Sequence, residues 1–168
     1  IQADSNLYQS DFRAPEKTFQ LIVQVSGRAG RHELKGDVLV QVFNTDHYAI
    51  KYAVNQDYQG FYDYEMRIRK LARYIPFYFL VQIECIGENI RDLFLRGKEI
   101  VNRLKSSLSS ESIVLGPALP PVARIKNKYR CQLLIKYRNE PNLDDVLFQI
   151  VDDFQTNEFY LSIDKSPM

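Results

Sequence analysis

The chain has 168 residues, enough for one domain of ordinary size or for two small ones. A hydrophobic content of 45% and a charged content of 26% are typical of globular proteins and exclude a chain that is disordered throughout. The formal net charge of +1 favours neither an acidic nor a basic partner, so only the distribution of charge along the chain is informative.

The cysteines and histidines indicate a reducing compartment and no metal centre. Cys85 and Cys131 each lie in an apolar, strand-like run, so we expect two buried free thiols in a cytosolic protein. His32 and His47 are too isolated for a metal-binding spacing. The longest apolar run, YIPFYFLV, is too short to cross a bilayer, and no signal pattern opens the chain. The first residue is Ile rather than Met, which suggests a longer parent protein.

The first part of the chain predicts helices and one strand. Residues 15–26 open with Pro and Glu and carry an apolar stripe at helical spacing, which predicts a helix that ends at Gly27 or Gly30. Residues 37–43, DVLVQVF, predict a strand, and a short helix should follow near 46–54. Because one strand cannot form a sheet alone, this half is typical of the end of a larger α/β domain.

A second amphipathic helix is predicted over residues 57–73 and should be ended by Pro76. Its apolar face would carry Phe61, Tyr64, Ile68 and Leu71. The basic residues of this segment fall largely elsewhere, and Arg67 and Lys70 have two interpretations: they could line a path for DNA, or they could belong to a solvated helix face.

After a boundary near residues 74–77 the pattern changes. It predicts, in order, a strand over 79–87, a helix over 90–108, a strand over 112–116, two strands within 123–137 that turn at Asn127, a helix over 142–154 and a strand over 158–164. The prolines of PALPP, residues 117–121, should exclude regular structure and form a rigid turn or an edge crossing. This order predicts a split βαβ arrangement with a mostly antiparallel sheet and both helices on one face.

The segment QVSGRAGR, residues 24–31, carries the clearest chemical signal. Arg28 and Arg31 are three residues apart, so they share a face at the end of a helix, and guanidinium groups match phosphate oxygens. Gly27 and Gly30 let a bulky anion come close. One interpretation is a glycine-rich turn with solvated arginines. The other is a device that braces a γ-phosphate from across a cleft, and Gln24 in front of the arginines favours it.

A second signal is RIKNKYRCQLLIKYR, residues 124–138, which is basic and has no acid. Alternate cations on two strands around a turn could point to one side and contact phosphates without reading sequence. These cations are Arg124, Lys126, Lys128 and Arg130. Tyr129 lies among them and could stack on an unpaired base. The alternative is an ordinary solvated sheet face with tyrosines in the core.

These motifs together resemble a known family. QVSGRAGR resembles motif VI of superfamily 2 helicases, and the longer stretch SDFRAPEKTFQLIVQVSGRAGRHELKGDVLVQVFN resembles the PriA family of primosomal replication-restart DNA helicases. Further similar segments are FYDYEMRIRKLARYIPF (61–77), LGPALPPVARIKNKYRCQLLIK (115–136) and SIDKSP (162–167). The resemblance covers nearly the whole chain.

The resemblance implies a division of the chain and roles for several residues. Residues 1–55 would be the incomplete end of the second RecA-like motor lobe, 56–76 a connecting helix, and 77–168 a ferredoxin-like C-terminal domain that binds DNA and partners. Arg31 would be the arginine finger on the γ-phosphate, with Arg28 as its partner and Gln24 in the same motif. Asp4 and Arg13 would belong to motif V, which couples the nucleotide to DNA.

For the parent protein, the resemblance implies an ATP-dependent DNA helicase that recognises stalled forks and initiates primosome assembly in the cytoplasm, at the nucleoid. It would use ATP and Mg, and it would hold zinc outside this chain. Its partners would be forked DNA, the tail of single-stranded-DNA-binding protein and other primosome proteins, with no membrane. The acidic segment 140–144 replaces Arg and Gln of some relatives, which puts the tail contact in question.

The chain lacks one essential part of a motor. No Gly-x-x-x-x-Gly-Lys-Ser/Thr loop, which would cradle phosphates, occurs in it, so we expect the chain alone to be inactive as an ATPase. A different interpretation therefore stays open. In it the chain is a non-enzymatic α+β module that binds nucleic acid or acts as a protein adaptor.

Overall fold

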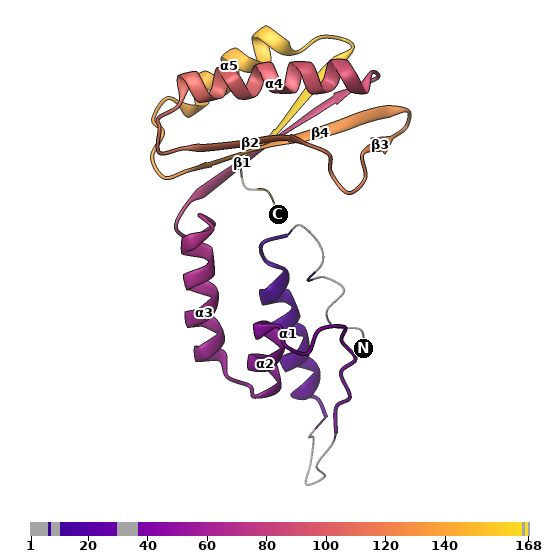
Figure 1. The fold of residues 1–168 in the computed structure, drawn as a ribbon, viewed down its shortest axis with the longest axis vertical. Helices are drawn as coiled ribbons and strands as arrows, with labels where there is room; N and C mark the ends of the chain where they lie inside the picture. The colour runs from indigo at the N-terminus through magenta and orange to yellow at the C-terminus, as the bar shows by residue number, and fades with distance from the viewer. Residues whose placement is uncertain (1–6, 8–10, 30–36, 166, 168) are drawn as a thin grey trace. The chain divides into compact units, whose positions relative to one another are not determined.

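The computed structural model describes residues 7, 11–29, 37–165 and 167. The chain divides into two compact units, Ile1–Ala72 and Arg73–Met168, which are described separately (Figure 1). The described part of the first unit is helical, whereas the second unit combines a sheet with two helices. No described helix is both long and apolar enough to cross a membrane.

In the first unit, α1 (Ala14–Ser26), α2 (Tyr48–Val54) and α3 (Tyr58–Leu71) form the described helices, as the sequence predicts. Proline in the first turn of α1 and a cap at Gly27 confirm the predicted bounds of that helix. The side chain of Asp57 begins α3 by accepting a hydrogen bond from the amide of Gly60. The helices pack around Phe19 and Phe61, whose ring centroids lie 4.3 Å apart.

The predicted strand over residues 37–43 is wrong, because only Gln41 makes an isolated bridge. Alternation itself is present: Val40 and Val42 pack against the helical core, whereas Leu39 and Phe43 are 92% and 75% exposed. A strand is defined by a ladder of hydrogen bonds, and no described strand lies beside this segment to form one. The sequence pattern therefore produces an extended segment with one apolar side open.

The predicted inner face of α3 is also wrong beyond Phe61. Tyr64 and Ile68 are each 40% exposed and Leu71 is 81% exposed. The helix instead buries Glu65 and Arg69, one and two turns after Phe61. Burial of these charges is possible because they pair with each other at 2.7 Å, which offsets part of the cost of removing them from water.

The second unit is an antiparallel five-stranded sheet with the order β2-β4-β1-β5, to which the short β3 is added beside β4. Its strands are β1 (Phe79–Gly87), β2 (Ile113–Ala118), β3 (Arg124–Ile125), β4 (Lys128–Tyr137) and β5 (Phe159–Asp164). The helices α4 (Ile90–Ser107) and α5 (Leu143–Phe154) cover the same face of the sheet (Figure 1). The predicted α+β class and the predicted order of strands and helices are confirmed.

Alternate residues of the two central strands build the core under α4 and α5. Val81 and Ile83 of β1 and Leu133 and Ile135 of β4 are fully buried. Cys85 and Cys131 lie directly opposite each other on β1 and β4, and both are buried and free, as predicted. A hydrogen bond with Cys131, together with burial, raises the pKa of Cys85, so this thiol stays protonated and unreactive.

The prolines after β2 do not end it as early as predicted. Pro117 and Ala118 belong to β2, which is tolerated because β2 is an edge strand and its register shifts between Leu115 and Ala118. Gly116 allows this irregularity with a φ of +107°, and a Cβ there would lie 2.6 Å from the carbonyl oxygen of Gln132. The exclusion of regular structure is therefore wrong for Pro117 and Ala118, whereas a position at the sheet edge agrees with the expected edge crossing.

A loop contact in the second unit gives a pH-dependent prediction. Glu140 accepts hydrogen bonds from the amide of Ser109 at 2.9 Å and from Oγ of Ser112 at 2.6 Å. Burial alone would raise the pKa of Glu140, but these hydrogen bonds outweigh it and the pKa is lowered below 4.5. Because the lowered pKa belongs to the folded state, the carboxylate stabilises the fold above pH 4.5 and this contribution is lost as the pH falls.

We therefore expect Glu140→Gln to lower the free energy of unfolding by about 1 kcal/mol at pH 7. The difference should shrink as the pH falls below the carboxyl's ordinary value. Thermal unfolding followed by circular dichroism between pH 3 and 8 measures this, with the exposed Glu158→Gln as the matched control. A difference between wild type and variant that stays constant over this range would contradict the assignment.

Candidate functional site

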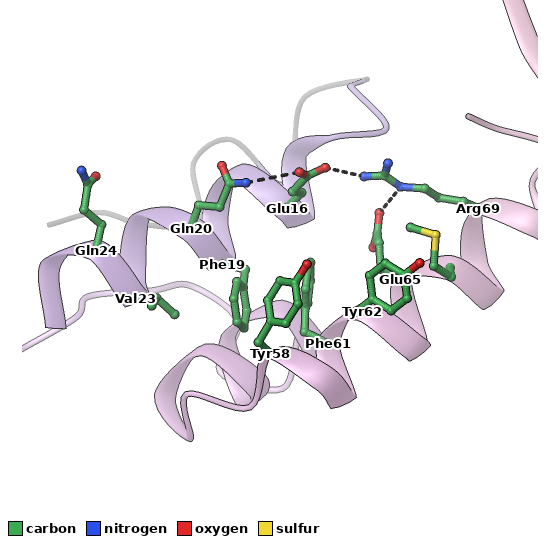
Figure 2. A pocket seen from close by; sticks show the side chains of 11 residues that line it. Glu16, Phe19, Gln20, Val23, Gln24, Tyr58, Phe61, Tyr62, Glu65 and Arg69 are labelled. Atoms are coloured by element: carbon green, nitrogen blue, oxygen red, sulfur yellow. Dashed lines mark hydrogen bonds and ion pairs between the residues drawn. The ribbon is translucent and has the colours of Figure 1, made fainter. Parts of the chain in front are cut away.

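An aromatic groove with a volume of about 460 Å³ lies between α1 and α3. Figure 2 shows the rings of Phe19, Tyr58 and Phe61 gathered in its middle, with Gln24 at one end. Phe19 and Phe61 are core residues, whereas Tyr58 is 64% exposed. The groove therefore exposes aromatic surface next to a residue of the predicted phosphate-bracing segment.

The other end of the groove is closed by a buried ion-pair network. Arg69 donates through Nε to Oε1 of Glu65 at 2.7 Å and through Nη2 to Oε2 of Glu16 at 2.8 Å (Figure 2). Tyr48 donates its hydroxyl to the second oxygen of Glu65 at 2.5 Å. Burial alone would lower the pKa of Arg69, but the bonds to the two carboxylates outweigh it and the pKa is raised. Arg69 thus joins α1 to α3 as a permanent cation.

Burial and the hydrogen bond to Glu65 raise the pKa of Tyr48 far above its usual range, so the phenol stays protonated and keeps donating. This network is not predicted from the sequence. A Glu65–Arg69 pair at i, i+4 is visible in the sequence as a helix-stabilising pattern. Nothing local indicates that Glu16, on another helix, completes it.

The described residues of the phosphate-bracing segment lie at the end of α1. Gln24 is exposed on the last turns of the helix, and Arg28 is exposed just after the cap at Gly27. The amide of Arg28 donates to the carbonyl of Val25 at 3.1 Å, so the helical turn continues through it. Within the described ranges the Arg28 side chain has no hydrogen-bond or ion-pair partner. Arg31 lies outside the described residues.

The predicted motif V residues have a different setting. Asp4 lies outside the described residues, and Arg13 stands at the N-terminal end of α1. The Nε of Arg13 pairs with Asp11 at 3.4 Å, and Lys17 pairs with the other oxygen of Asp11 at 2.7 Å. Burial would raise the pKa of Asp11, but the bonds from Lys17 and Arg13 lower it overall. These contacts give Arg13 a local structural partner.

The basic hairpin, β3 and β4 with the turn between them, has the predicted turn. Lys126 and Asn127 adopt φ values of 47° and 63°, in the left-handed region. Arg124 lies opposite Tyr129 and places its guanidinium carbon 4.9 Å from the centre of that ring. Lys128 alternates with Tyr129 and therefore projects from the other face. The expectation of one common side therefore holds for Lys128 and Arg130, whereas register places Arg124 on the other face.

Arg130 is the second departure from the predicted basic surface. Its Nη2 pairs with Oε1 of Glu84 on β1 at 2.5 Å, and Gln132 approaches the same oxygen at 3.5 Å. Lys126 and Lys128 are exposed and have no side-chain partner in the described part of the chain. Two of the four expected cations are therefore free to meet an anion without first breaking a contact.

On α3, Arg67 and Lys70 are exposed, and neither has a side-chain partner among the described residues. Arg69 between them is buried in the network described above. Arg69 therefore has a structural role on the face of α3 that packs on α1, whereas Arg67 and Lys70 stay exposed to solvent. The described residues contain no cluster of three or more His, Cys, Asp or Glu side chains that could hold a metal ion.

Comparison with known proteins decides the family. Residues 70–168 match the family described as Primosomal protein N C-terminal domain. The chain belongs to this family. The match begins close to the boundary between Ala72 and Arg73, so the primosomal protein N C-terminal domain corresponds to the second unit.

Curated relatives extend the similarity to the first unit. A replication restart protein PriA of Bacillus subtilis is 38% identical over 99% of this chain, which is 21% of the relative. A PriA of Synechocystis is 34% identical over 100% of the chain and 20% of the relative. A PriA of Chlamydia pneumoniae is 39% identical over 81% of the chain and 18% of the relative. The chain thus spans about a fifth of the length of these relatives of the primosomal protein N family.

Proposed function

We propose that this chain is the C-terminal part of an ATP-dependent DNA helicase that acts in replication restart. The observation that carries the proposal is continuous similarity to proteins named replication restart protein PriA, over both units and through QVSGRAGR. In the proposal the whole protein recognises stalled forks and initiates primosome assembly in the cytoplasm, at the nucleoid. Its partners are forked DNA, the tail of single-stranded-DNA-binding protein and other primosome proteins.

Residues 1–55 are proposed to be the end of the second RecA-like motor lobe, and residues 56–76 a connecting helix. The open apolar side of residues 37–43, with Leu39 and Phe43 exposed, supports this, because it is the alternation of a strand that would join a larger sheet. Arg31 and Arg28 would offset negative charge on the γ-phosphate of ATP, with Gln24 beside them, and a Mg ion would neutralise further phosphate charge. Arg28 suits this role because it is exposed and has no partner within the described ranges.

The proposed roles of Arg13, ATP and zinc depend on residues or contacts that differ from those seen in this structure. Arg13 is already bound to Asp11, so a role with Asp4 in coupling nucleotide to DNA would require Arg13 to exchange partners. ATP would supply the phosphoryl group whose hydrolysis drives unwinding, and its phosphate loop would come from elsewhere in the protein. Zinc in the parent would likewise be held by residues other than those described here.

Proposed DNA contacts divide between the units. Lys126, Lys128 and Arg124 on the basic hairpin, and Arg67 and Lys70 on α3, would meet phosphates without reading sequence. Tyr129 would stack on a base only after Arg124 leaves its ring. Arg130 would act chiefly through its ion pair with Glu84, which ties β4 to β1.

The test compares this chain with the full-length protein. Full-length protein should hydrolyse ATP when forked DNA is present and should unwind the fork, whereas the chain alone should show no turnover above background. A coupled ATPase assay and a strand-displacement assay on the same fork measure both. Turnover by the chain alone, or a full-length protein that neither hydrolyses ATP nor unwinds DNA, would overturn the proposal.

A second candidate is a non-enzymatic adaptor that binds nucleic acid or a protein. The second unit favours it, because its sheet and both helices close a core of their own. Hydrogen exchange of the chain distinguishes the two. An adaptor requires slow exchange across residues 37–43, whereas the end of a motor lobe requires fast exchange there and slow exchange in β1 and β4.

A further inference from the structure

A group of cations and tyrosines stands where β1 begins and β4 ends, and we name it the aromatic–cation cluster: Arg73, Tyr74, Tyr78, Lys136 and Arg138. The guanidinium carbons of Arg73 and Arg138 lie 5.6 Å and 5.8 Å from the centre of the Tyr78 ring. Lys136 places Nζ 3.5 Å from the centre of the Tyr74 ring. All five residues belong to the second unit.

Strand register explains why these residues meet. Phe79 pairs with Tyr137, so Tyr78 and Arg138 continue the two strands side by side just beyond this pair. Leu80 pairs with Lys136 one step further into the sheet. Val81 and Ile135 point into the core under α4. Their neighbours Leu80 and Lys136 therefore point to the sheet face away from the helices, and Tyr78 and Arg138 continue the same alternation. Lys136 lies in β4, Tyr78 and Arg138 directly adjoin the ends of β1 and β4, and Arg73 and Tyr74 precede β1.

The cluster concentrates positive charge. Arg73 and Arg138 are exposed, and within the described ranges neither pairs with a carboxylate. Burial, and then the charge of Arg73, lower the pKa of Lys136. The acid nearest to Arg138 in sequence, Glu140, is bound to Ser109 and Ser112 instead. The exposed Arg73 and Arg138 are therefore available to an anion.

The same sheet face extends the cations along β4. Lys136, Arg130 and Lys128 alternate on it, and Arg138 follows its end, which spans roughly 30 Å at 3.3 Å per residue. Arg130 is paired with Glu84 and Lys136 is buried, so Lys128 and Arg138 are the exposed members of this line. An extended ligand with repeated negative charges fits such a line better than a short acidic tail, which would need one compact pocket.

We infer that the aromatic–cation cluster binds the phosphate groups of a DNA backbone, through the two arginines that Tyr78 supports. Arginine forks match phosphate oxygens in pairs. Tyr78 already carries both guanidinium groups, so it is a support for the arginines rather than a platform for a base. Binding should therefore be sensitive to salt and independent of base sequence. The inference rests on the proposed DNA-binding function and names a surface for it beyond the hairpin and α3.

The test measures binding of this 168-residue chain to fluorescent DNA by polarisation, across a range of salt. Arg73→Ala with Arg138→Ala should weaken binding to single-stranded DNA about tenfold, equally for oligo-dT and mixed sequence. The slope of log affinity against log salt should fall by about 1.4, the value for two lost phosphate contacts on a single strand. Duplex and forked DNA of equal length, and inorganic phosphate as competitor, identify which source of phosphate binds best.

Matched variants separate this site from general charge effects. Arg91→Ala with Lys98→Ala removes the same charge from exposed positions on α4 and should leave the slope unchanged. Tyr78→Phe keeps the ring and should bind as wild type, whereas Tyr78→Ala should lose most of what the double arginine variant loses. Circular dichroism melts confirm that each variant is folded.

Three outcomes would overturn the inference. The α4 control could weaken binding as much as the cluster variant, which would indicate net charge alone. The cluster variant could bind DNA with the same affinity and salt slope as wild type. This outcome would refute the cluster as a DNA-binding site but leave the proposed DNA-binding function unaffected. The cluster variant could lose binding to an aspartate-rich peptide but not to DNA, which would assign the cluster to a protein partner. No DNA binding by wild type would instead refute the proposed function itself.

Discussion

Replacing Arg69 with methionine is expected to lower the free energy of unfolding of the first unit by about 3–5 kcal/mol. The change leaves the Glu65 carboxylate without its cation while the side chain is only 4% exposed. It also removes the bond from Arg69 to Glu16 that joins α3 to α1. Methionine fills much of the same space, so the loss reports the charge and its hydrogen bonds rather than a cavity.

The measurement is hydrogen exchange of the α1 and α3 amides, because it reports this unit separately from the sheet. Arg67→Met, an exposed neighbour on the same helix, is the matched control and should change stability by no more than about 0.5 kcal/mol. A double variant, Glu65→Leu with Arg69→Met, should recover much of the loss because no charge is left buried. Simple additivity of the two single variants, or a loss below that of the control, would refute the role of the network.

The second unit was predictable because its sequence carries one strong signal at each element. The stripe of α4, with Leu93, Gly97, Ile100 and Leu104 buried, follows from helical spacing alone. The strands β1 and β4 alternate between core and solvent in the same way. The failure at Pro117 had a specific cause, since edge position is a property of the whole sheet and not of the local sequence.

The first unit was less predictable because contacts far apart in sequence decide its burial. Periodicity ranked Ile68 and Leu71 as inner residues of α3, yet partners on α1 and α2 made Glu65 and Arg69 the buried positions. For residues 37–43 the alternation was correct and the pairing was absent from the described residues. The side-chain pattern indicates which face of a segment is packed. A β-strand forms only when a neighbouring strand provides hydrogen-bond partners.

The site residues also divide into those that the local sequence predicts and those that depend on contacts far apart in the sequence. The exposure of Gln24 and Arg28 at the end of α1 agrees with a segment that reaches toward an anion. The basic hairpin was predicted as one surface, but strand register places Arg124 against the ring of Tyr129. Arg130 forms an ion pair with Glu84 of β1. The aromatic–cation cluster was not foreseen, because Arg73 and Arg138 meet only when β1 pairs with β4.

The largest effect on activity is expected from Arg31→Ala in the full-length protein, under the proposal that this residue is the arginine finger. ATP turnover should fall by about 10³–10⁵-fold, because a guanidinium that offsets charge on the γ-phosphate stabilises the transition state more than the ground state. Arg28→Ala should also lower turnover, by a smaller factor, since Arg28 lies three residues before Arg31 in QVSGRAGR.

Two comparisons make this prediction specific. Arg31→Lys keeps the charge but loses the planar fork, so most of the activity should still be lost. Lys17→Ala removes an exposed cation from the same helix as Gln24 and should leave turnover within a factor of about two, because Lys17 only pairs with Asp11 at the protein surface. Affinity for forked DNA, measured by polarisation, should stay near wild type in Arg31→Ala. Normal ATP turnover by that variant would refute the finger assignment, whereas a parallel loss of DNA affinity would show that the arginine acts on DNA instead.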